Sequence, residues 1–142
     1  MNTRHITQII TLLGVFAMSA GLLSATAKPA QEAQTAAEQW LALIDAGKFG
    51  EGWKAAAAYL QKAAPQQQFI KSLDAVRKPL GKLVSRKLKS AKYTKSVPGA
   101  PDGEYVILQF DTSFESKKEA VETVTPMREK DGKWKVSGYF IQ

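Results

Sequence analysis

The sequence predicts an α+β fold in which three N-terminal helices pack on a curved, cone-like, four-stranded antiparallel sheet. Apolar residues recur at helical spacing through the first half of the chain, and from Lys82 onward they alternate with a period of two. Segments rich in Gly, Pro and Asp separate the alternating stretches, which is typical of strands joined as a meander. Because the helices precede the strands, they are expected to cover one face of the sheet.

The three helices are expected near residues 30–46, 50–62 and 66–77. Each carries an apolar stripe at the spacing of an α-helix. The stripe residues are Ala33, Ala36, Ala37, Trp40, Leu41 and Ile44 in the first helix, Trp53, Ala56, Ala57 and Leu60 in the second, and Phe69, Leu73 and Val76 in the third. Lys78 precedes Pro79, which disfavours helical geometry, so the helical half is expected to end there.

The four strands are expected near residues 83–95, 104–114, 119–129 and 133–141. In the second strand one face should meet the helices, and the other, mixed face should meet solvent or a dimer partner. The inward residues are Val106, Leu108, Phe110, Thr112 and Phe114, and the outward ones are Tyr105, Ile107, Gln109, Asp111 and Ser113.

A two-residue turn at Asp131 and Gly132 is expected to join the last two strands. Such a turn would pair Val124 with Tyr139 and Glu122 with Ile141, and place Glu122 and Tyr139 on one face as diagonal neighbours. The alternation also predicts that Trp134 lies in the core, on the face shared with Val136 and Phe140.

Residues 1–27 have the pattern of a secretory signal peptide. Arg4 precedes an uncharged apolar stretch, and Ala25-Thr26-Ala27 forms the small-x-small sequence that a signal peptidase reads. The apolar stretch is short and interrupted by Gly and Ser, unlike a membrane-spanning helix. We therefore expect cleavage after Ala27, export to the periplasm, and a single domain over residues 28–142.

The composition excludes several chemistries. The chain has no Cys, and its one His, His5, lies in the predicted leader. The mature chain then lacks Ser-His-Asp and Cys-His nucleophilic machinery, and lacks the ligands of most zinc, copper and haem sites. No phosphate-binding loop or carboxylate set for calcium or magnesium is evident. We therefore predict no metal, no cofactor and no catalytic residue of these classes.

Ligand-pocket candidates come from the aromatic residues and one carboxylate: Glu122, Tyr139, Trp40 and Trp53. Glu122 in an apolar setting could act as a general base, with Asp45 and Asp111 as further carboxylates to consider. The alternative is that Glu122 forms a structural ion pair with Arg77 or Arg86. For each aromatic residue, the alternative is that it simply fills the core.

A basic strip spans residues 77–95 and contains no acidic residue. Its cations are Arg77, Lys78, Lys82, Arg86, Lys87, Lys89, Lys92 and Lys95. Lysines on a strand can protect a sheet edge against aggregation. The alternative is weak binding of anionic envelope lipid, polysaccharide or membrane surface. Nucleic acid is not expected as a partner, because the cations fall on both strand faces and only Tyr93 offers a stacking ring.

Several segments together resemble a bacterial exported family, the domain of unknown function 4019. They are "AEQWLALIDAGKFGEGW", "RKPLG" followed by "SRKL", "PGAPDGEYVILQFDTSFESKKEAVETVT" and "DGKWKVSGYFIQ". The resemblance spans residues 33–142 and implies a fold similar to the nuclear-transport-factor-2-like group, whose helices cover a bent sheet and leave a conical pocket. It implies no activity and no catalytic residues.

Three function hypotheses follow. The first is a non-catalytic module that binds an unknown small molecule or an envelope protein, with a homodimer through the sheet as one form of interaction. The second is a metal-independent enzyme that uses Glu122 as general acid or base. The third is binding of an anionic surface through the basic strip.

Overall fold

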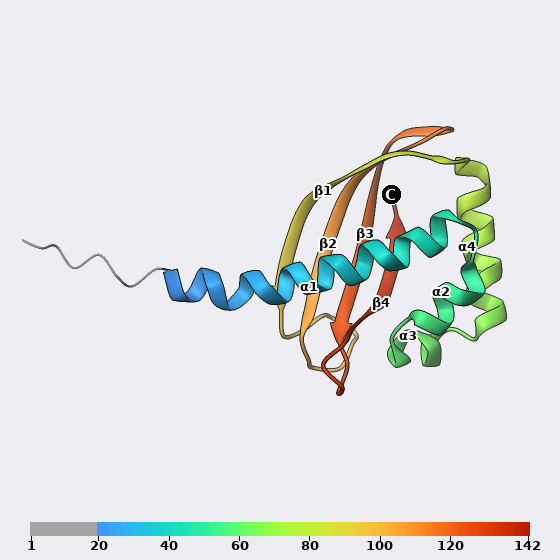
Figure 1. Ribbon diagram of the computed structural model, residues 1–142. Helices are drawn as coiled ribbons and strands as arrows, with labels where there is room; N and C mark the ends of the chain where they lie inside the picture. The colour runs from blue at the N-terminus through green and yellow to red at the C-terminus, as the bar shows by residue number, and fades with distance from the viewer. Residues whose placement is uncertain (1–19) are drawn as a thin grey trace, which may run out of the picture.

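A computed structural model describes residues 20–142, in which four helices precede a four-stranded antiparallel sheet (Figure 1). The α+β class and the order of helices before strands are therefore confirmed. The elements are α1 (Ala20–Asp45), α2 (Phe49–Ala55), α3 (Ala58–Ala63), α4 (Gln66–Leu80), β1 (Leu83–Thr94), β2 (Tyr105–Phe114), β3 (Lys117–Arg128) and β4 (Trp134–Ile141).

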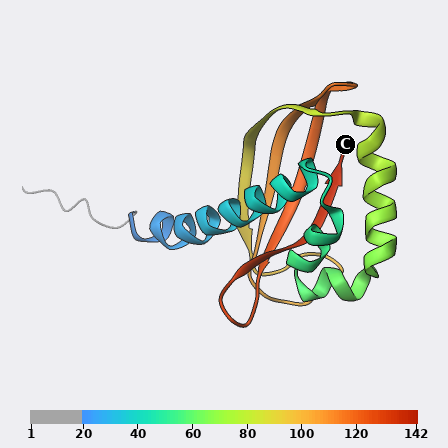
Figure 2. The same cartoon turned by 45° about the vertical axis from the view of Figure 1, so that its right-hand side comes forward.

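Helix α1 is longer than expected, because it already includes Ala20, the first described residue, rather than starting near residue 30. The added segment is rich in Ala and Leu, which favour helix, and Pro29 lies inside it. This segment projects beyond β1, while the rest of α1 crosses the sheet (Figures 1 and 2). Residues 1–19 of the predicted leader lie outside the described residues. No helix in the described part of the chain is long and apolar enough to span a membrane.

The second expected helix, 50–62, is wrong as a single element, because the chain breaks between α2 and α3 at Ala56 and Ala57. The backbone N–H of Ala57 donates to the carbonyl of Val136 on β4 at 2.8 Å, and that of Ala58 donates to the Glu129 carboxylate at 3.0 Å. Ala56 and Ala57 are buried. Their small side chains let the backbone of this segment approach the sheet. Bonds to β4 and to the β3–β4 loop thus take the place of hydrogen bonds within a continuous helix.

Helix α4 continues through Pro79 to Leu80, three residues beyond its expected end. Gly81 then adopts φ 74°, a left-handed conformation that Gly tolerates best. The backbone N–H of Ser116 donates to the carbonyl of Leu80 at 2.9 Å, which ties the end of α4 to the β2–β3 turn. A tertiary bond therefore extends the helix past the position where the sequence signals a stop.

The sheet is a meander in the order β1-β2-β3-β4, so β1 and β4 are its edges. The inward face of β2 is confirmed, because Val106, Leu108, Phe110 and Phe114 are buried, and Asp111 on the other face is exposed. The outward assignment of Tyr105 is wrong: it is fully buried, and its hydroxyl donates to the carbonyl of Pro101 at 2.5 Å. Helix α1 lies across this inward face and buries Ala33, Ala37, Trp40, Leu41 and Ile44 against it (Figure 1). Each large apolar side chain buried there contributes roughly 1.5–3 kcal/mol relative to leaving it in water.

The β3–β4 hairpin differs from the expected two-residue turn. Gly132 donates its N–H to the carbonyl of Glu129 at 2.9 Å, Glu129 donates to Lys133 at 2.8 Å, and Gly132 has φ 86°. The loop therefore has three residues, a turn followed by a left-handed Gly. A β-bulge at Ser137 then shifts the register back. The predicted pairs, Val124 with Tyr139 and Glu122 with Ile141, are confirmed because the two shifts compensate.

The bulge also reverses which side chains of β4 point inward. Trp134 and Val136 are buried as expected, but after Ser137 it is Tyr139 that contacts the core. Phe140 is 52% exposed, so its expected place beside Trp134 and Val136 is wrong. An extra residue in a strand changes the face of every residue that follows it.

Candidate functional site

A cluster of buried and partly buried polar side chains lies between the helices and the inward face of the sheet. Glu122 comes from β3, Tyr139 from β4 and Arg86 from β1, and helix ends supply Asp45 and Arg77. The hydroxyl of Thr112 on β2 completes the cluster. Every strand and both long helices therefore contribute one or more residues.

Glu122 is the centre of the cluster and is fully buried. Its Oε1 atom accepts hydrogen bonds from Arg86 Nε at 2.6 Å and from the hydroxyl of Thr112 at 2.7 Å. Its Oε2 atom accepts from Arg86 Nη2 at 3.2 Å and from the hydroxyl of Tyr139. Four donors thus saturate the carboxylate, which is the arrangement that stabilises a buried anion.

Arg86 also connects this carboxylate to Asp45. Its Nη1 and Nη2 atoms lie 2.7 and 2.9 Å from the two carboxylate oxygens of Asp45. Arg77 donates from Nη2 to Asp45 at 2.9 Å. Two guanidinium groups therefore balance two carboxylates. Of the partners expected for Glu122, Arg86 forms the ion pair, and Arg77 pairs with Asp45 instead.

These contacts set the pKa values of the titratable side chains in the cluster. Burial acts to raise the pKa of Asp45, but the hydrogen bonds and charges of Arg86 and Arg77 outweigh it and hold the pKa below its ordinary value. Burial lowers the pKa of Arg86, yet its bonds to Asp45 and Glu122 raise it overall. Burial, and then the charge and hydrogen bond of Glu122, raise the pKa of Tyr139. The phenol therefore stays protonated at neutral pH.

The guanidinium of Arg77 also lies over an aromatic ring. Its Cζ atom is 4.9 Å from the centroid of Phe114, a cation–π distance. The Nε and Nη1 atoms of Arg77 are buried and have no hydrogen-bond partner among the described residues. Stacking and the bond to Asp45 thus hold this side chain in place.

Trp40 and Trp53 use their indole N–H groups to hold neighbouring segments. Trp40 donates to the carbonyl of Gly52 at 2.8 Å, and Trp53 donates to that of Ala64 at 2.8 Å. The Trp40 ring packs edge-on against Tyr139 with a centroid separation of 5.2 Å, which steadies the phenol beside Glu122. Both Trp side chains therefore have a structural role in this arrangement.

An apolar groove lies between α4 and the outer edge of β4, with a volume of about 390 Å³. Val76 on α4 is 47% exposed and Phe140 on β4 is 52% exposed. The lining residues are Leu60, Phe69, Ser72, Leu73, Val76, Ser137, Gly138, Tyr139, Phe140 and Ile141. Of the sequence candidates, only Tyr139 reaches this groove. In the sequence, Gly138 was the one signal of a β-bulge, because Gly inside a strand often marks one. A bulge there implies that Phe140 points outward.

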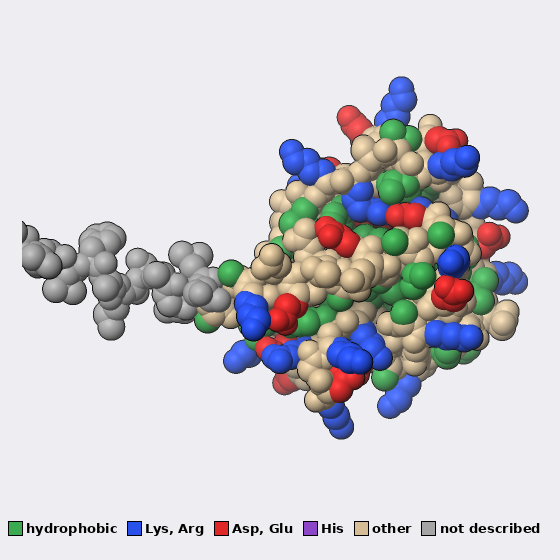
Figure 3. Space-filling model, viewed as in Figure 1, with side chains coloured by type: hydrophobic (Ala, Val, Ile, Leu, Met, Phe, Trp, Pro, Cys, Tyr) green, Lys and Arg blue, Asp and Glu red, His purple; other side chains and the backbone are tan. Residues whose placement is uncertain are grey.

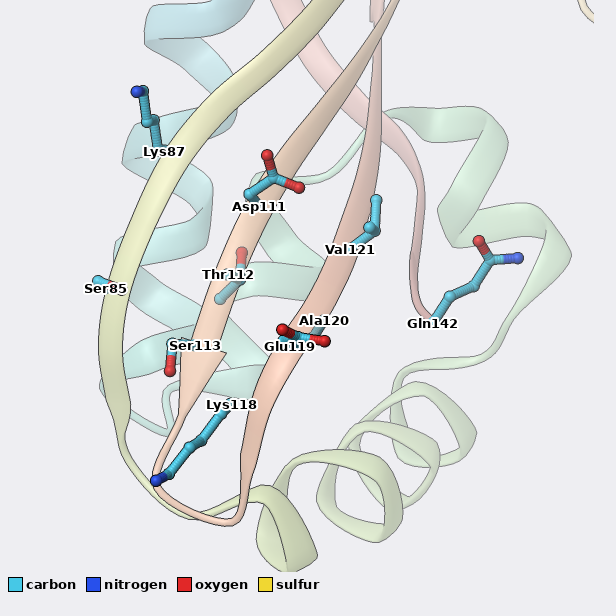
Figure 4. Close-up of a pocket in the computed structure, with 10 residues that line it drawn as sticks. All are labelled: Ser85, Lys87, Asp111, Thr112, Ser113, Lys118, Glu119, Ala120, Val121 and Gln142. Atoms are coloured by element: carbon cyan, nitrogen blue, oxygen red, sulfur yellow. The ribbon is translucent and has the colours of Figure 1, made fainter.

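A second, open hollow lies on the outer face of the sheet, with a volume of about 620 Å³ (Figure 4). Its lining includes two cations, Lys87 and Lys118, and two acids, Asp111 and Glu119, among neutral residues. Asp111 thus belongs to the outward face that the alternation predicted. The mixture of charges gives this hollow no single ligand preference.

The basic strip is not a continuous surface. Its two arginines, Arg77 and Arg86, are turned inward and neutralised by carboxylates. The other six members, Lys78, Lys82, Lys87, Lys89, Lys92 and Lys95, are exposed. Lys and Arg side chains are spread around the rim of the helical face, with Asp and Glu among them (Figure 3). Strand β1 is an edge strand, which is the position that edge protection by lysine requires.

No group of His, Cys, Asp or Glu residues within residues 20–142 is arranged to hold a metal ion. The carboxylates of Asp45 and Glu122 face guanidinium groups instead. The buried cluster thus has the chemistry of a structural network.

Comparison with known proteins identifies a family but no activity. The family model described as "Protein of unknown function (DUF4019)" matches residues 36–139. No curated protein matches the chain. A solved structure from Catenulispora acidiphila is similar, with a TM-score of 0.55 and 10% sequence identity, over 84% of this chain and 94% of that one. At that identity the likeness concerns the fold alone.

Proposed function

Because the chain belongs to the DUF4019 family of proteins of unknown function, we propose from its own geometry that it is a non-catalytic binding module. It takes an apolar ligand in the groove between α4 and β4. The observation that carries this proposal is the exposure of Val76 and Phe140 at that groove. They are two of the three large hydrophobic side chains that are exposed among the described residues.

The groove has the size and lining of a ligand site. Its volume of about 390 Å³ lies within the range of small-molecule pockets, roughly 300–1,000 Å³. Its walls are mostly apolar, and Ser72 offers a hydroxyl group beside them, whereas the hydroxyl of Ser137 donates to the carbonyl of Thr125 at 2.7 Å. Covering the exposed part of Phe140 and Val76 would gain about 25 cal/mol for each Å² removed from water.

The same geometry supports a binding role over an enzymatic one. A general base needs a free lone pair within reach of its substrate. The carboxylate of Glu122 accepts four hydrogen bonds and is fully buried. Glu122 is then a fixed anion that anchors Tyr139 at the wall of the groove.

The first test is a fluorescence titration with N-phenylnaphthylamine, an uncharged probe that brightens in apolar surroundings. Val76→Ser and Phe140→Ser should each weaken binding by about tenfold, which is ~1.4 kcal/mol. Val84→Ser is the matched control, because Val84 is an exposed valine on β1, outside the groove lining. Equal binding by all four proteins would contradict the proposal.

We also propose that residues 1–27 are a leader that directs the domain to the periplasm. The support is the sequence of that segment, with Arg4 before an apolar stretch and Ala25-Thr26-Ala27 after it. The test is the intact mass of the protein recovered from a periplasmic extract. A mass that still includes residues 1–27 would contradict cleavage.

A further inference from the structure

The backbone of β4 presents hydrogen-bonding groups to the groove. Val121 and Gln142 exchange both of their backbone hydrogen bonds, each at 2.9 Å. Along an antiparallel pair such residues alternate with residues whose backbone groups point away from the partner strand. The N–H and C=O groups of Ile141 and Tyr139 therefore point away from β3, toward the open edge.

At one end of β4, this edge already forms a hydrogen bond within the protein. The carbonyl of Val136 accepts a hydrogen bond from Ala57 at the start of α3. Further along β4, no backbone hydrogen bond outside the sheet reaches Tyr139 or Ile141 from any residue in 20–142. Two donors and two acceptors are thus aligned beside an apolar wall. An unpaired strand edge of this kind is a template for another strand.

The walls of the groove decide what can pair with this edge. Helices α3 and α4 flank β4, and Leu60, Phe69 and Leu73 line the side opposite the strand. In a second copy of the chain the same helices would flank β4, so the helices of the two copies would meet before their strand edges did. A single extended segment has no such flanks and can enter.

We propose that the ligand of the groove is an extended peptide that adds to β4 as a fifth, antiparallel strand. This inference rests on the proposed function of the groove and identifies its ligand class. Residues opposite Tyr139 and Ile141 would point toward Phe69, Leu73 and Val76, so they should be apolar. The residue between them would lie beside the exposed ring of Phe140 and should be β-branched or aromatic. Main-chain bonds then supply affinity, and these alternate side chains supply specificity.

The test uses a fluorescent seven-residue peptide with the sequence lysine-valine-threonine-valine-threonine-valine-lysine, acetylated and amidated at its ends. Two isomers separate main-chain pairing from simple apolar contact. In one the valine nitrogens are methylated, and in the other the threonine nitrogens are methylated. When the valines face α4, they lie opposite Tyr139 and Ile141, so the valine N–H groups donate to the backbone of β4 and the threonine N–H groups point away from it.

The parent peptide and the N-methyl-threonine isomer should bind alike, and the N-methyl-valine isomer should bind about tenfold more weakly or worse. The amide signals of Tyr139 and Ile141 should shift on binding, and Phe140→Ser should weaken it whereas Val84→Ser should not. Equal binding of both isomers, or the reverse order, would overturn antiparallel addition to this edge. A dimer in which the Tyr139 and Ile141 amides are already protected from exchange would also overturn it.

The two proposals fail in different ways. If N-phenylnaphthylamine binds in the groove and the peptide does not bind, the peptide inference is wrong and the binding module stands. If neither binds, the proposed function itself is wrong.

Discussion

Replacing Glu122 by Gln tests whether the buried ion network holds the helices to the sheet. The amide has nearly the same volume, so no cavity forms, but the charge that faces Arg86 at 2.6 Å is lost. The new NH₂ group would also face hydrogen-bond donors. Asp45 would then be the only carboxylate paired with Arg86 and Arg77. Removing one partner of a buried pair costs on the order of 3–5 kcal/mol.

The assay is urea unfolding at neutral pH, followed by tryptophan fluorescence, with the midpoint and slope both fitted. Glu104→Gln is the matched control, because Glu104 pairs with Arg128 at 3.2 Å in a solvent-exposed position. Glu104→Gln should lower the free energy of unfolding by less than about 1 kcal/mol. A Glu122→Gln protein as stable as the control would refute the claim that the network carries this part of the fold.

Three further predictions concern the same core. Trp134→Ala should lower the free energy of unfolding by about 3–5 kcal/mol, because the ring is buried; a midpoint near that of the unmodified protein would contradict this. Gly52→Ala should destabilise by about 1–3 kcal/mol, because its Cβ would lie 2.7 Å from Ile44 Cδ1; full stability in urea would show that Ile44 adapts freely. The pKa of Tyr139 is raised above its ordinary value of 10.0, so the contribution of its protonated phenol to the free energy of unfolding is complete below pH 10 and declines as pH rises further. Tyr139→Phe should remove that part of the decline and leave Glu122 with one hydrogen-bond donor fewer. The same dependence of unfolding free energy on pH above 10 in both proteins would contradict this prediction.

Local patterns in the sequence predict much of the fold. The alternation in β2 places Phe110 and Phe114 correctly on the buried face, although Tyr105, predicted on the other face, is also buried. The stripe in α1 correctly places Trp40, Leu41 and Ile44 in the core. These features depend on periodicity alone, which each segment carries by itself.

The features that the sequence did not predict depend on contacts between distant segments. The break at Ala57 requires the carbonyl of Val136, and the extension of α4 requires the N–H of Ser116. Periodicity within one segment carries no information about such partners.

The candidate site shows the same division. Diagonal placement of Glu122 and Tyr139 followed from the hairpin signal, although the turn and the bulge at Ser137 differ from the simple hairpin. The second carboxylate–guanidinium pair, Asp45 with Arg77, joins two helix ends that no pattern relates. Of the groove, the sequence predicted only Tyr139 as a lining residue. The exposed ring of Phe140 was not predicted, because it depends on the bulge at Ser137.

The most direct test of the central claim is an NMR map of where N-phenylnaphthylamine binds to the isotopically labelled protein. We expect amide shifts to cluster on one side of α4, around Leu73 and Val76, and on the last residues of β4, around Phe140. Shifts centred on Asp111 and Lys118, on the outer face of the sheet, would contradict binding in the groove between α4 and β4. No shifts with either the probe or the peptide at saturation would contradict binding in the groove equally.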